Sequence, residues 1–235
     1  MSGNPTLVPA PQLVAKNEAH VPGESPAYRA ARNALMIQEI ELRRHLERVA
    51  AQRRALPPGG TVPHDYSFNA ATGPIRLSQL FGDHDTLMVY SMMYGPQRAA
   101  PCPSCTSCLS AWNGVAVNLR QRVALAVTAR SPIERLMEYR AQRGYGHLTF
   151  YADTSGDYTR AYVSPTDADI PGFSVFVRRD GVLRHFYSGE MSGKMSDPGQ
   201  DPRGAPDLDP LWTMLDWTPE GRGIDWYPKL EYGRK

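Results

Sequence analysis

The apolar positions of this chain fall into short segments that alternate between strand spacing and helix spacing. Residues 86–93 and 123–127 are nearly continuous apolar runs, which is typical of strands buried on both faces of a parallel sheet. Between them, apolar residues recur every three or four positions from Cys105 to Leu119, as in an amphipathic helix. This order predicts a strand–helix–strand unit.

One further helix and three further strands are predicted downstream. Ser131-Pro132-Ile133-Glu134 has the form of a capping box and predicts a helix that ends at Gly144. Strand patterns follow at residues 147–151, 173–177 and 182–187, and Asp180-Gly181 between the last two is a strong hairpin signal. The succession predicts an α/β fold with a thioredoxin-like central mixed sheet flanked by helices.

The N-terminal part is predicted to lie outside this sheet. Residues 1–24 contain several prolines and no sustained period, so we expect an extended or disordered arm. Ser25 and Pro26 then form a typical helix start, and a long N-terminal helix is expected over 25–56. Its apolar residues form one stripe, made up of Tyr28, Ala31, Leu35, Leu42, Leu46 and Val49. A helix of roughly 45 Å overhangs a small domain, so the stripe serves either a homodimer or packing across its own domain.

The rest of the chain divides into a domain and an extension. Pro57-Pro58-Gly59-Gly60 ends the helix, and the thioredoxin-like domain is expected over 57–190. Residues 191–235 are rich in Gly, Pro and Asp and end with several aromatic residues. We therefore expect a C-terminal extension that packs on the body through these aromatic side chains.

The three cysteines of the chain, Cys102, Cys105 and Cys108, lie within seven positions, where the predicted central strand gives way to the predicted helix. A Cys-x-x-Cys pair in that context is typical of a thioredoxin-like redox motif. The exposed N–H groups of a helix start stabilise a thiolate, so Cys102 is expected to have a lowered pKa and to be the attacking thiol. Pro103 suits the first helical turn, and Cys105, three residues on, is the expected resolving thiol.

Cys108 leaves alternatives open. It is either a competing resolving thiol or a small buried apolar residue on the inner helix face. The cluster as a whole also fits three other roles: inert packing or a structural disulfide, a soft-metal site for copper or zinc, and a redox sensor without turnover. A complete metal cluster normally needs a fourth ligand, and the chain has no fourth cysteine. We expect no metal and no cofactor.

Composition narrows the range of partners and compartments. The net charge of +2 disfavours a dedicated nucleic-acid surface. No apolar run approaches the ~20 residues that span a bilayer, and no secretory signal pattern is visible at the N-terminus, so we expect no membrane association. With its cysteines in one cluster, the chain is expected in a reducing cytoplasm, acting on a protein or small-molecule disulfide or thiol.

The sequence also resembles a known family, the bacterial domain-of-unknown-function family 899, whose members are predicted thioredoxin-like dithiol–disulfide oxidoreductases. The resemblance covers nearly everything from Ala27 onward. It is carried by eight short segments in a shared order: 53–57, Asp65-Tyr66, Leu77–Phe81, Met93–Pro96, Cys102–Cys105, Gly172–Phe176, His185–Ser188, and Leu215–Pro219 with Gly221-Arg222. It implies a thioredoxin fold and thiol redox activity at Cys102 and Cys105, without a substrate.

The resemblance also suggests which residues surround the dithiol. Thioredoxins place a cis-proline directly before the strand that faces the dithiol, yet counting back from Gly181 puts Gly172 or Phe173 there and Pro171 one or two residues too early. Residues 96–101 lack the Pro-x-x-x-Thr/Ser spacing of peroxiredoxins, which disfavours a peroxidase. The remaining motif and groove candidates are Ser104, Tyr94 and Trp112, of which the last two are expected to pack rather than react, and Arg98, a candidate for stabilising the thiolate.

Overall fold

The computed structural model describes residues 7–166, 168–189, 207–221, 223 and 225–232, which divide into two units, Met1–Pro57 and Pro58–Lys235. Among the described residues, no helix combines the length and the apolar character needed to cross a bilayer.

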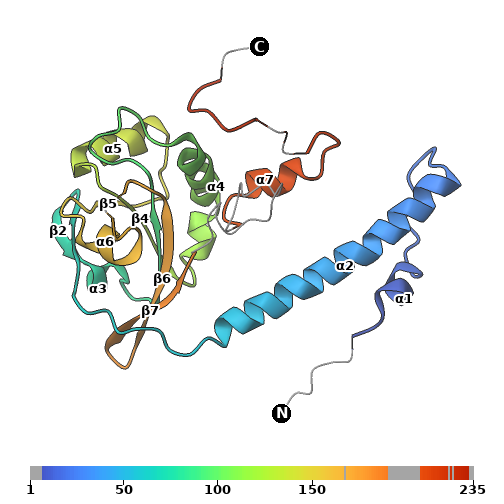
Figure 1. Ribbon diagram of the computed structural model, residues 1–235, viewed down its shortest axis with the longest axis horizontal. Helices are drawn as coiled ribbons and strands as arrows, with labels where there is room; N and C mark the ends of the chain where they lie inside the picture. The colour runs from blue at the N-terminus through green and yellow to red at the C-terminus, as the bar shows by residue number, and fades with distance from the viewer. Residues whose placement is uncertain (1–6, 167, 190–206, 222, 224, 233–235) are drawn as a thin grey trace. The chain divides into compact units, whose positions relative to one another are not determined.

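The first unit consists of two helices, α1 (Ala10–Val14) and α2 (Pro26–Arg54) (Figure 1). The predicted start of α2 is confirmed: Ser25 is the N-cap, and its side chain accepts a hydrogen bond from the Tyr28 N–H (3.1 Å). The expectation of an extended arm before residue 25 is wrong for α1. Its Ala10 and Val14 are buried against Ile40 of α2, because a short apolar segment lowers its exposed area by folding onto the longer helix.

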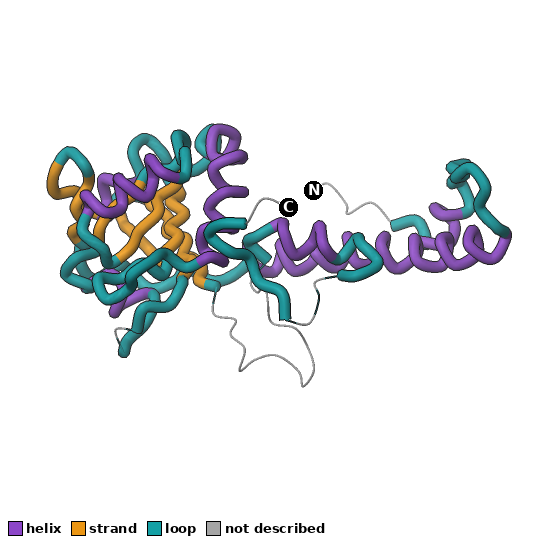
Figure 2. Tube along the Cα trace, turned by 90° about the horizontal axis from the view of Figure 1, so that it is seen from above, coloured by secondary structure: helices purple, strands orange, loops and turns teal. Residues whose placement is uncertain are grey.

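The second unit is built on a seven-stranded sheet (Figure 2). Along the chain its strands are β1 (Ser67–Ala70), β2 (Gly73–Arg76), β3 (Thr86–Ser91), β4 (Ala124–Ala129), β5 (Phe150–Ala152), β6 (Gly172–Arg179) and β7 (Val182–Ser188). Their order across the sheet is β2-β1-β5-β4-β3-β6-β7. Strands β3, β4 and β5 are parallel, whereas β6 runs antiparallel to β3 and β7 antiparallel to β6. The order β7-β6-β3-β4 with β6 reversed is the thioredoxin arrangement, so the predicted fold class is confirmed.

The helices of this unit are α3 (Leu77–Leu80), α4 (Pro103–Leu119), α5 (Ile133–Gln142), α6 (Asp157–Tyr162) and α7 (Pro210–Leu215). Two hydrophobic cores lie on opposite faces of the sheet. The face covered by α4 and α5 buries Tyr90 of β3 and Leu136 of α5, and the face covered by α3 and α6 buries Val89 of β3 and Tyr158 of α6. Neighbouring residues of β3 thus point to opposite faces, as strand geometry requires.

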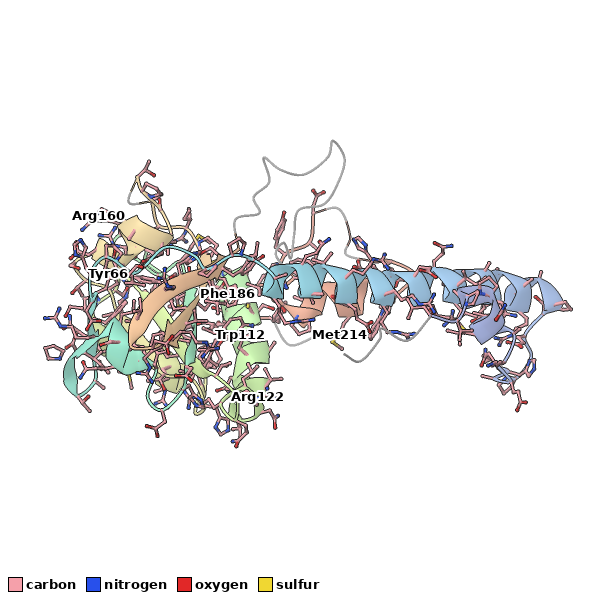
Figure 3. All side chains as sticks on the ribbon, turned by 90° about the horizontal axis from the view of Figure 1, so that it is seen from below. Tyr66, Trp112, Arg122, Arg160, Phe186 and Met214 are labelled. Carbon is pink, nitrogen blue, oxygen red and sulfur yellow. The ribbon has the colours of Figure 1, made fainter. Side chains whose placement is uncertain are left out.

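Strands β6 and β7 form the predicted hairpin, in which both Asp180 (φ 50°) and Gly181 (φ 74°) adopt the left-handed conformation of a two-residue turn. The pairing carries an irregularity: Val175 lies opposite Tyr187 and Phe176 opposite His185, so Phe186 is an extra residue on β7 (Figure 3).

The helix α5 begins differently from the prediction. The sequence predicts a capping box in which Ser131 caps the helix, but Pro132 is its N-cap. The buried hydroxyl of Ser131 instead donates a hydrogen bond to the carbonyl of Tyr94 (2.6 Å), in the loop that follows β3. The Ser131 hydroxyl thus makes a tertiary hydrogen bond instead of capping the helix, so the predicted capping box is wrong.

The described part of the C-terminal extension contacts the body through α7. Asp209 is the N-cap of α7 and accepts a hydrogen bond from the Leu211 N–H (3.0 Å). Trp212 is buried, and the rings of Trp226 and Tyr227 pack edge-on against it at centroid distances of 6.0 and 6.3 Å. Part of the predicted extension, residues 191–206, lies outside the described residues.

Candidate active site

The cysteine cluster lies where β3 has ended and α4 begins, as the sequence predicts. Cys102 is the N-cap of α4, with Pro103 at the first helical position. The backbone on both sides holds Cys102 in place: its N–H donates to the carbonyl of Met93 (3.1 Å), and its carbonyl accepts from the N–H of Thr106 (3.0 Å). All three cysteines are free and buried.

Cys102 is the acidic thiol of the cluster. A hydrogen bond from the Cys105 thiol is the largest influence and helps lower the pKa of Cys102 to about 6. The backbone N–H groups of Cys105 and Ser104 at the helix start, and the positive charge of Arg98, act in the same direction, while burial opposes them. These influences together favour the thiolate form of Cys102.

Cys105 behaves in the opposite way. Its thiol donates to the Cys102 sulfur, and this bond, together with burial and the negative charge on Cys102, raises the pKa of Cys105 strongly. The pair thus shares one proton between two sulfurs within hydrogen-bonding reach. One sulfur is the more acidic and the other holds the proton, an arrangement compatible with thiol–disulfide exchange.

Cys108 is set apart from this pair. Its Sγ donates to the carbonyl of Leu208 (3.6 Å), and burial, followed by the nearby charge of Asp209, raises the pKa of Cys108 to about 12. This environment favours the reading of Cys108 as a small buried residue over that of a competing thiol.

Tyr90 is a site residue that the sequence analysis missed. It lies on β3, and its hydroxyl is hydrogen-bonded to the sulfurs of both Cys105 and Cys108. Burial and the negative charge of the cysteines raise the pKa of Tyr90 well above its usual value, so it is a proton donor. The period of two along β3 was the available signal, because it places Tyr90 on the face that α4 covers.

Arg98 is held near the thiolate by an ion pair. Its Nε donates to the Oδ2 of Asp169 (2.5 Å), and the same oxygen accepts from the Gly95 N–H (3.2 Å). A Cβ at Gly95 would lie 3.1 Å from the Asp169 carboxyl carbon, so the glycine leaves room for this contact. The charge of Arg98 lowers the pKa of Cys102, but less than Cys105 or the helix N–H groups do.

The loop between β3 and Cys102 is clasped by Arg135 of α5. Its guanidinium donates to the carbonyls of Arg98 (2.5 Å), Ala99 (3.1 Å) and Gly95 (3.5 Å). It also lies 4.2 Å above the ring of Tyr94. Tyr94 therefore packs in this clasp, as expected, rather than facing the sulfurs.

A cavity of about 190 Å³ opens onto the sulfurs. The described residues that line it are Tyr90, Met93, Cys102, Ser104, Cys105, Cys108, Pro171, Gly172, Phe173, Gly189, Leu208, Asp209 and Trp212. Of the predicted groove residues, Ser104, Pro171 and Phe173 are thus brought to the dithiol. Pro103, Tyr94, Arg98 and Trp112 are not among the lining residues.

Trp112 does not line the cavity itself but contacts two residues that do. It projects from α4 (Figure 3), packs edge-on against Phe173 at 5.7 Å, and donates from Nε1 to the carbonyl of Leu208 (3.0 Å).

The expectation that Pro171 lies one or two residues too early to precede the strand is wrong. Strand β6 begins at Gly172, one or two residues earlier than counting from Gly181 suggests, so Pro171 directly precedes it.

The soft-metal alternative needs a group of ligands in one place. Within the described ranges, no set of three or more His, Cys, Asp or Glu side chains is arranged to hold a metal ion.

Comparison with known proteins assigns a family. The family model DUF899, described as a bacterial protein of unknown function, matches residues 18–232. The chain belongs to this family. DUF899 membership agrees with the resemblance seen in the sequence and carries no activity with it. No curated protein matches the chain.

Several solved structures are similar to this DUF899 member. The hypothetical protein SMc02350 of Sinorhizobium meliloti 1021 is 21% identical over 64% of this chain and 79% of its own, with a TM-score of 0.40. PrxQ of Xylella fastidiosa is 14% identical over 57% and 84%, with a TM-score of 0.41. Reduced Prx3 of Vibrio vulnificus is 12% identical over 65% and 98%, with a TM-score of 0.42.

Proposed function

We propose that this DUF899 protein is a dithiol–disulfide oxidoreductase in which Cys102 attacks and Cys105 resolves. The observation that carries the proposal is the polarised pair at the start of α4. Cys102 has a pKa of about 6, and the Cys105 thiol is hydrogen-bonded to it. A buried packing cysteine has no cause for a lowered pKa, because burial alone raises it.

In the first step, the Cys102 thiolate attacks one sulfur of a substrate disulfide. A mixed disulfide forms between Cys102 and one half of the substrate, and the substrate S–S bond breaks. The other half leaves as a thiolate and takes a proton from solvent.

In the second step, Cys105 loses its proton and attacks the Cys102 sulfur. The mixed disulfide has removed the negative charge and the hydrogen-bond acceptor that raised the pKa of Cys105, so its thiol becomes more acidic at this point. The Tyr90 hydroxyl stabilises the Cys105 thiolate through its hydrogen bond. The second substrate half leaves as a thiol, and two electrons have passed from the dithiol to the substrate.

An external thiol donor then reduces the Cys102–Cys105 disulfide. In a reducing cytoplasm, where we place the protein, the pair rests as the dithiol between turnovers.

The decisive experiment combines a thiol titration with trapping. Reduced protein is alkylated with iodoacetamide across pH, and peptide mass spectrometry follows modification of Cys102. The expected rate rises through a midpoint near pH 6. Dipyridyl disulfide, a small neutral probe, should release two pyridinethiones from the native protein. It should release one from Cys105→Ser, which retains the mixed disulfide.

A Cys102 midpoint near the ordinary thiol value of about 8.5, together with no pyridinethione release, would contradict the proposal. Cys108→Ser is the matched control, because it removes one thiol of the cluster and should leave both pyridinethiones and the midpoint unchanged.

We also propose that two copies of the chain pair through α2. Tyr28, Leu35, Leu42 and Val49 follow one another at seven-residue intervals and so lie along one side of α2, where Leu35 and Leu42 are 53% and 59% exposed. An identical helix is the partner that such a repeat fits, because it presents the same spacing.

A further inference from the structure

The cavity at the dithiol has mainly apolar walls. Met93, Pro171, Phe173, Leu208 and Trp212 surround the sulfurs, and Cys102 and Cys105 are only 6% and 2% exposed. A substrate disulfide must therefore bring its sulfur into the cavity, rather than meet Cys102 at the surface.

The wall opposite β6 comes from the C-terminal extension. Leu208 is tied to α4 by hydrogen bonds from Trp112 and Cys108, and Trp212 of α7 is buried beside it. With this wall in place the cavity has a volume of about 190 Å³. That volume admits a small organic molecule, whereas a disulfide in a folded protein brings two backbone segments with it.

The described residues give the cavity a negative charge. Asp209 is a buried carboxylate, 7% exposed, and it is the acidic side chain among the described lining residues, which include no lysine or arginine. The Cys102 thiolate adds a second negative charge. Among the described residues, Arg98 is a nearby cation, and it is paired with Asp169.

We infer that, if the proposed function holds, the dithiol acts on small disulfides whose bodies are neutral or cationic, and that Asp209 selects against disulfides bearing carboxylates. In a partly buried site, two like charges several ångströms apart repel with little screening, so an anionic disulfide binds the cavity less well. Apolar and cationic bodies meet no such cost. The C-terminal wall excludes protein disulfides by size.

The test measures single-turnover oxidation of the reduced protein by three small disulfides of similar length. They are hydroxyethyl disulfide, which is neutral, cystamine, which is a dication, and dithiodipropionate, which is a dianion. Each converts the dithiol to the Cys102–Cys105 disulfide and releases two small thiols, so no other reductant is needed. Insulin serves as the protein disulfide.

The informative variant is Asp209→Asn. Asparagine caps helices about as well as aspartate, so the start of α7 is kept while the charge is removed. We expect the rate constant for dithiodipropionate to rise about tenfold relative to that for hydroxyethyl disulfide, and the cystamine rate to fall. Dividing each variant rate by the native rate removes the intrinsic reactivity of each disulfide.

Asp207→Asn is the matched control. Asp207 is an exposed carboxylate two residues earlier and does not line the cavity, so its removal changes net charge equally without changing the discrimination. An unchanged ratio of the dithiodipropionate rate to the hydroxyethyl disulfide rate in Asp209→Asn would overturn the role of Asp209. Oxidation by insulin as fast as by hydroxyethyl disulfide would overturn the size limit.

A failure of the inferred substrate preference can be told apart from a failure of the proposed function. If neither the three small disulfides nor dipyridyl disulfide oxidises the dithiol, the exchange chemistry itself is absent. If insulin alone does so, the exchange chemistry stands and the substrate class is wrong.

Discussion

The indole N–H of Trp112 donates a 3.0 Å hydrogen bond to the carbonyl of Leu208, 96 residues further along the chain. The same carbonyl accepts from Cys108 Sγ at 3.6 Å. A single backbone oxygen thus joins α4 to the segment that precedes α7. Because Leu208 also lines the cavity, this contact couples the helix that carries the thiols to the wall that encloses them.

We predict that Trp112→Phe loosens the C-terminal wall. The ring is kept for packing against Phe173, but the hydrogen bond is lost, at an expected cost of about 1 kcal/mol in the free energy of unfolding. Hydrogen exchange measured by mass spectrometry should show faster exchange over residues 207–216. Trp217→Phe is the control, because Trp217 is 80% exposed and should change neither quantity. Unaltered exchange in Trp112→Phe would show that the bond does not hold the wall.

We predict that Cys105→Ala raises the pKa of Cys102 above about 6. The hydrogen bond from Cys105 is the largest influence lowering this pKa, and alanine removes the donor. At a pH between the two midpoints, less thiolate is present in the variant, so alkylation of Cys102 is slower. Above the higher midpoint the two proteins converge.

Arg98→Gln provides the comparison for this titration. Its charge is a smaller influence than Cys105, so the rise in the Cys102 pKa should be smaller as well. A larger rise in Arg98→Gln than in Cys105→Ala would reverse the order of causes found in the structure.

We predict that Tyr90→Phe slows resolution without slowing attack. The lost hydroxyl is hydrogen-bonded to Cys105, and its removal makes the Cys105 thiol harder to deprotonate. Stopped-flow measurement with dipyridyl disulfide should show an unchanged first release of pyridinethione and a second release about tenfold slower. Raising the pH should recover part of the lost rate, which a purely structural defect would not do.

Tyr151→Phe is the matched variant for that experiment. Tyr151 is a partly buried tyrosine on β5 that packs against the core on the other face of the sheet, so both phases should keep their native rates. Slowing of the first phase in Tyr90→Phe would contradict the assignment of Tyr90 to Cys105.

We predict that Leu42→Lys converts a dimer into a monomer. A charge in the middle of the apolar repeat of α2 must be desolvated in a paired helix but not in a free one. Analytical ultracentrifugation measures the change. Ala51→Lys adds the same charge on the opposite side of α2 and should leave the dimer intact. A native protein that sediments as a monomer would remove the proposed pairing.

Several elements followed from sequence pattern because their determinants are local. Ser25 and Pro26 begin a helix through contacts within one turn, and Asp180-Gly181 adopts conformations that few other residues tolerate. The strand–helix junction at Cys102 was likewise visible, since the spacing changes there from continuous to helical.

Other features depend on tertiary contacts, which the spacing of residues along the sequence does not reveal. Ser131 has the residue type of a cap, but its hydroxyl bonds the Tyr94 carbonyl 37 residues away. The position of Pro171 was misjudged because β6 is longer than its apolar pattern and pairs irregularly near Phe176.

The cavity was the least predictable part of the candidate site. Periodicity places Tyr90 on the inner face of β3, but not its hydroxyl within reach of two sulfurs. Leu208 and Asp209 lie about a hundred residues beyond the cysteines, in a stretch with no motif, and only the packing of α7 on α4 brings them there.

The guanidinium of Arg135 makes the two sides of the cavity unequal. It spans three carbonyls of the 95–99 loop and a tyrosine ring at once, a reach that the compact ammonium group of a lysine does not have. The side of the cavity next to Met93 and Cys102 is therefore the more rigid one. If the cavity widens to admit a larger ligand, the movement must therefore occur around Leu208, where a single carbonyl oxygen holds the segment to α4.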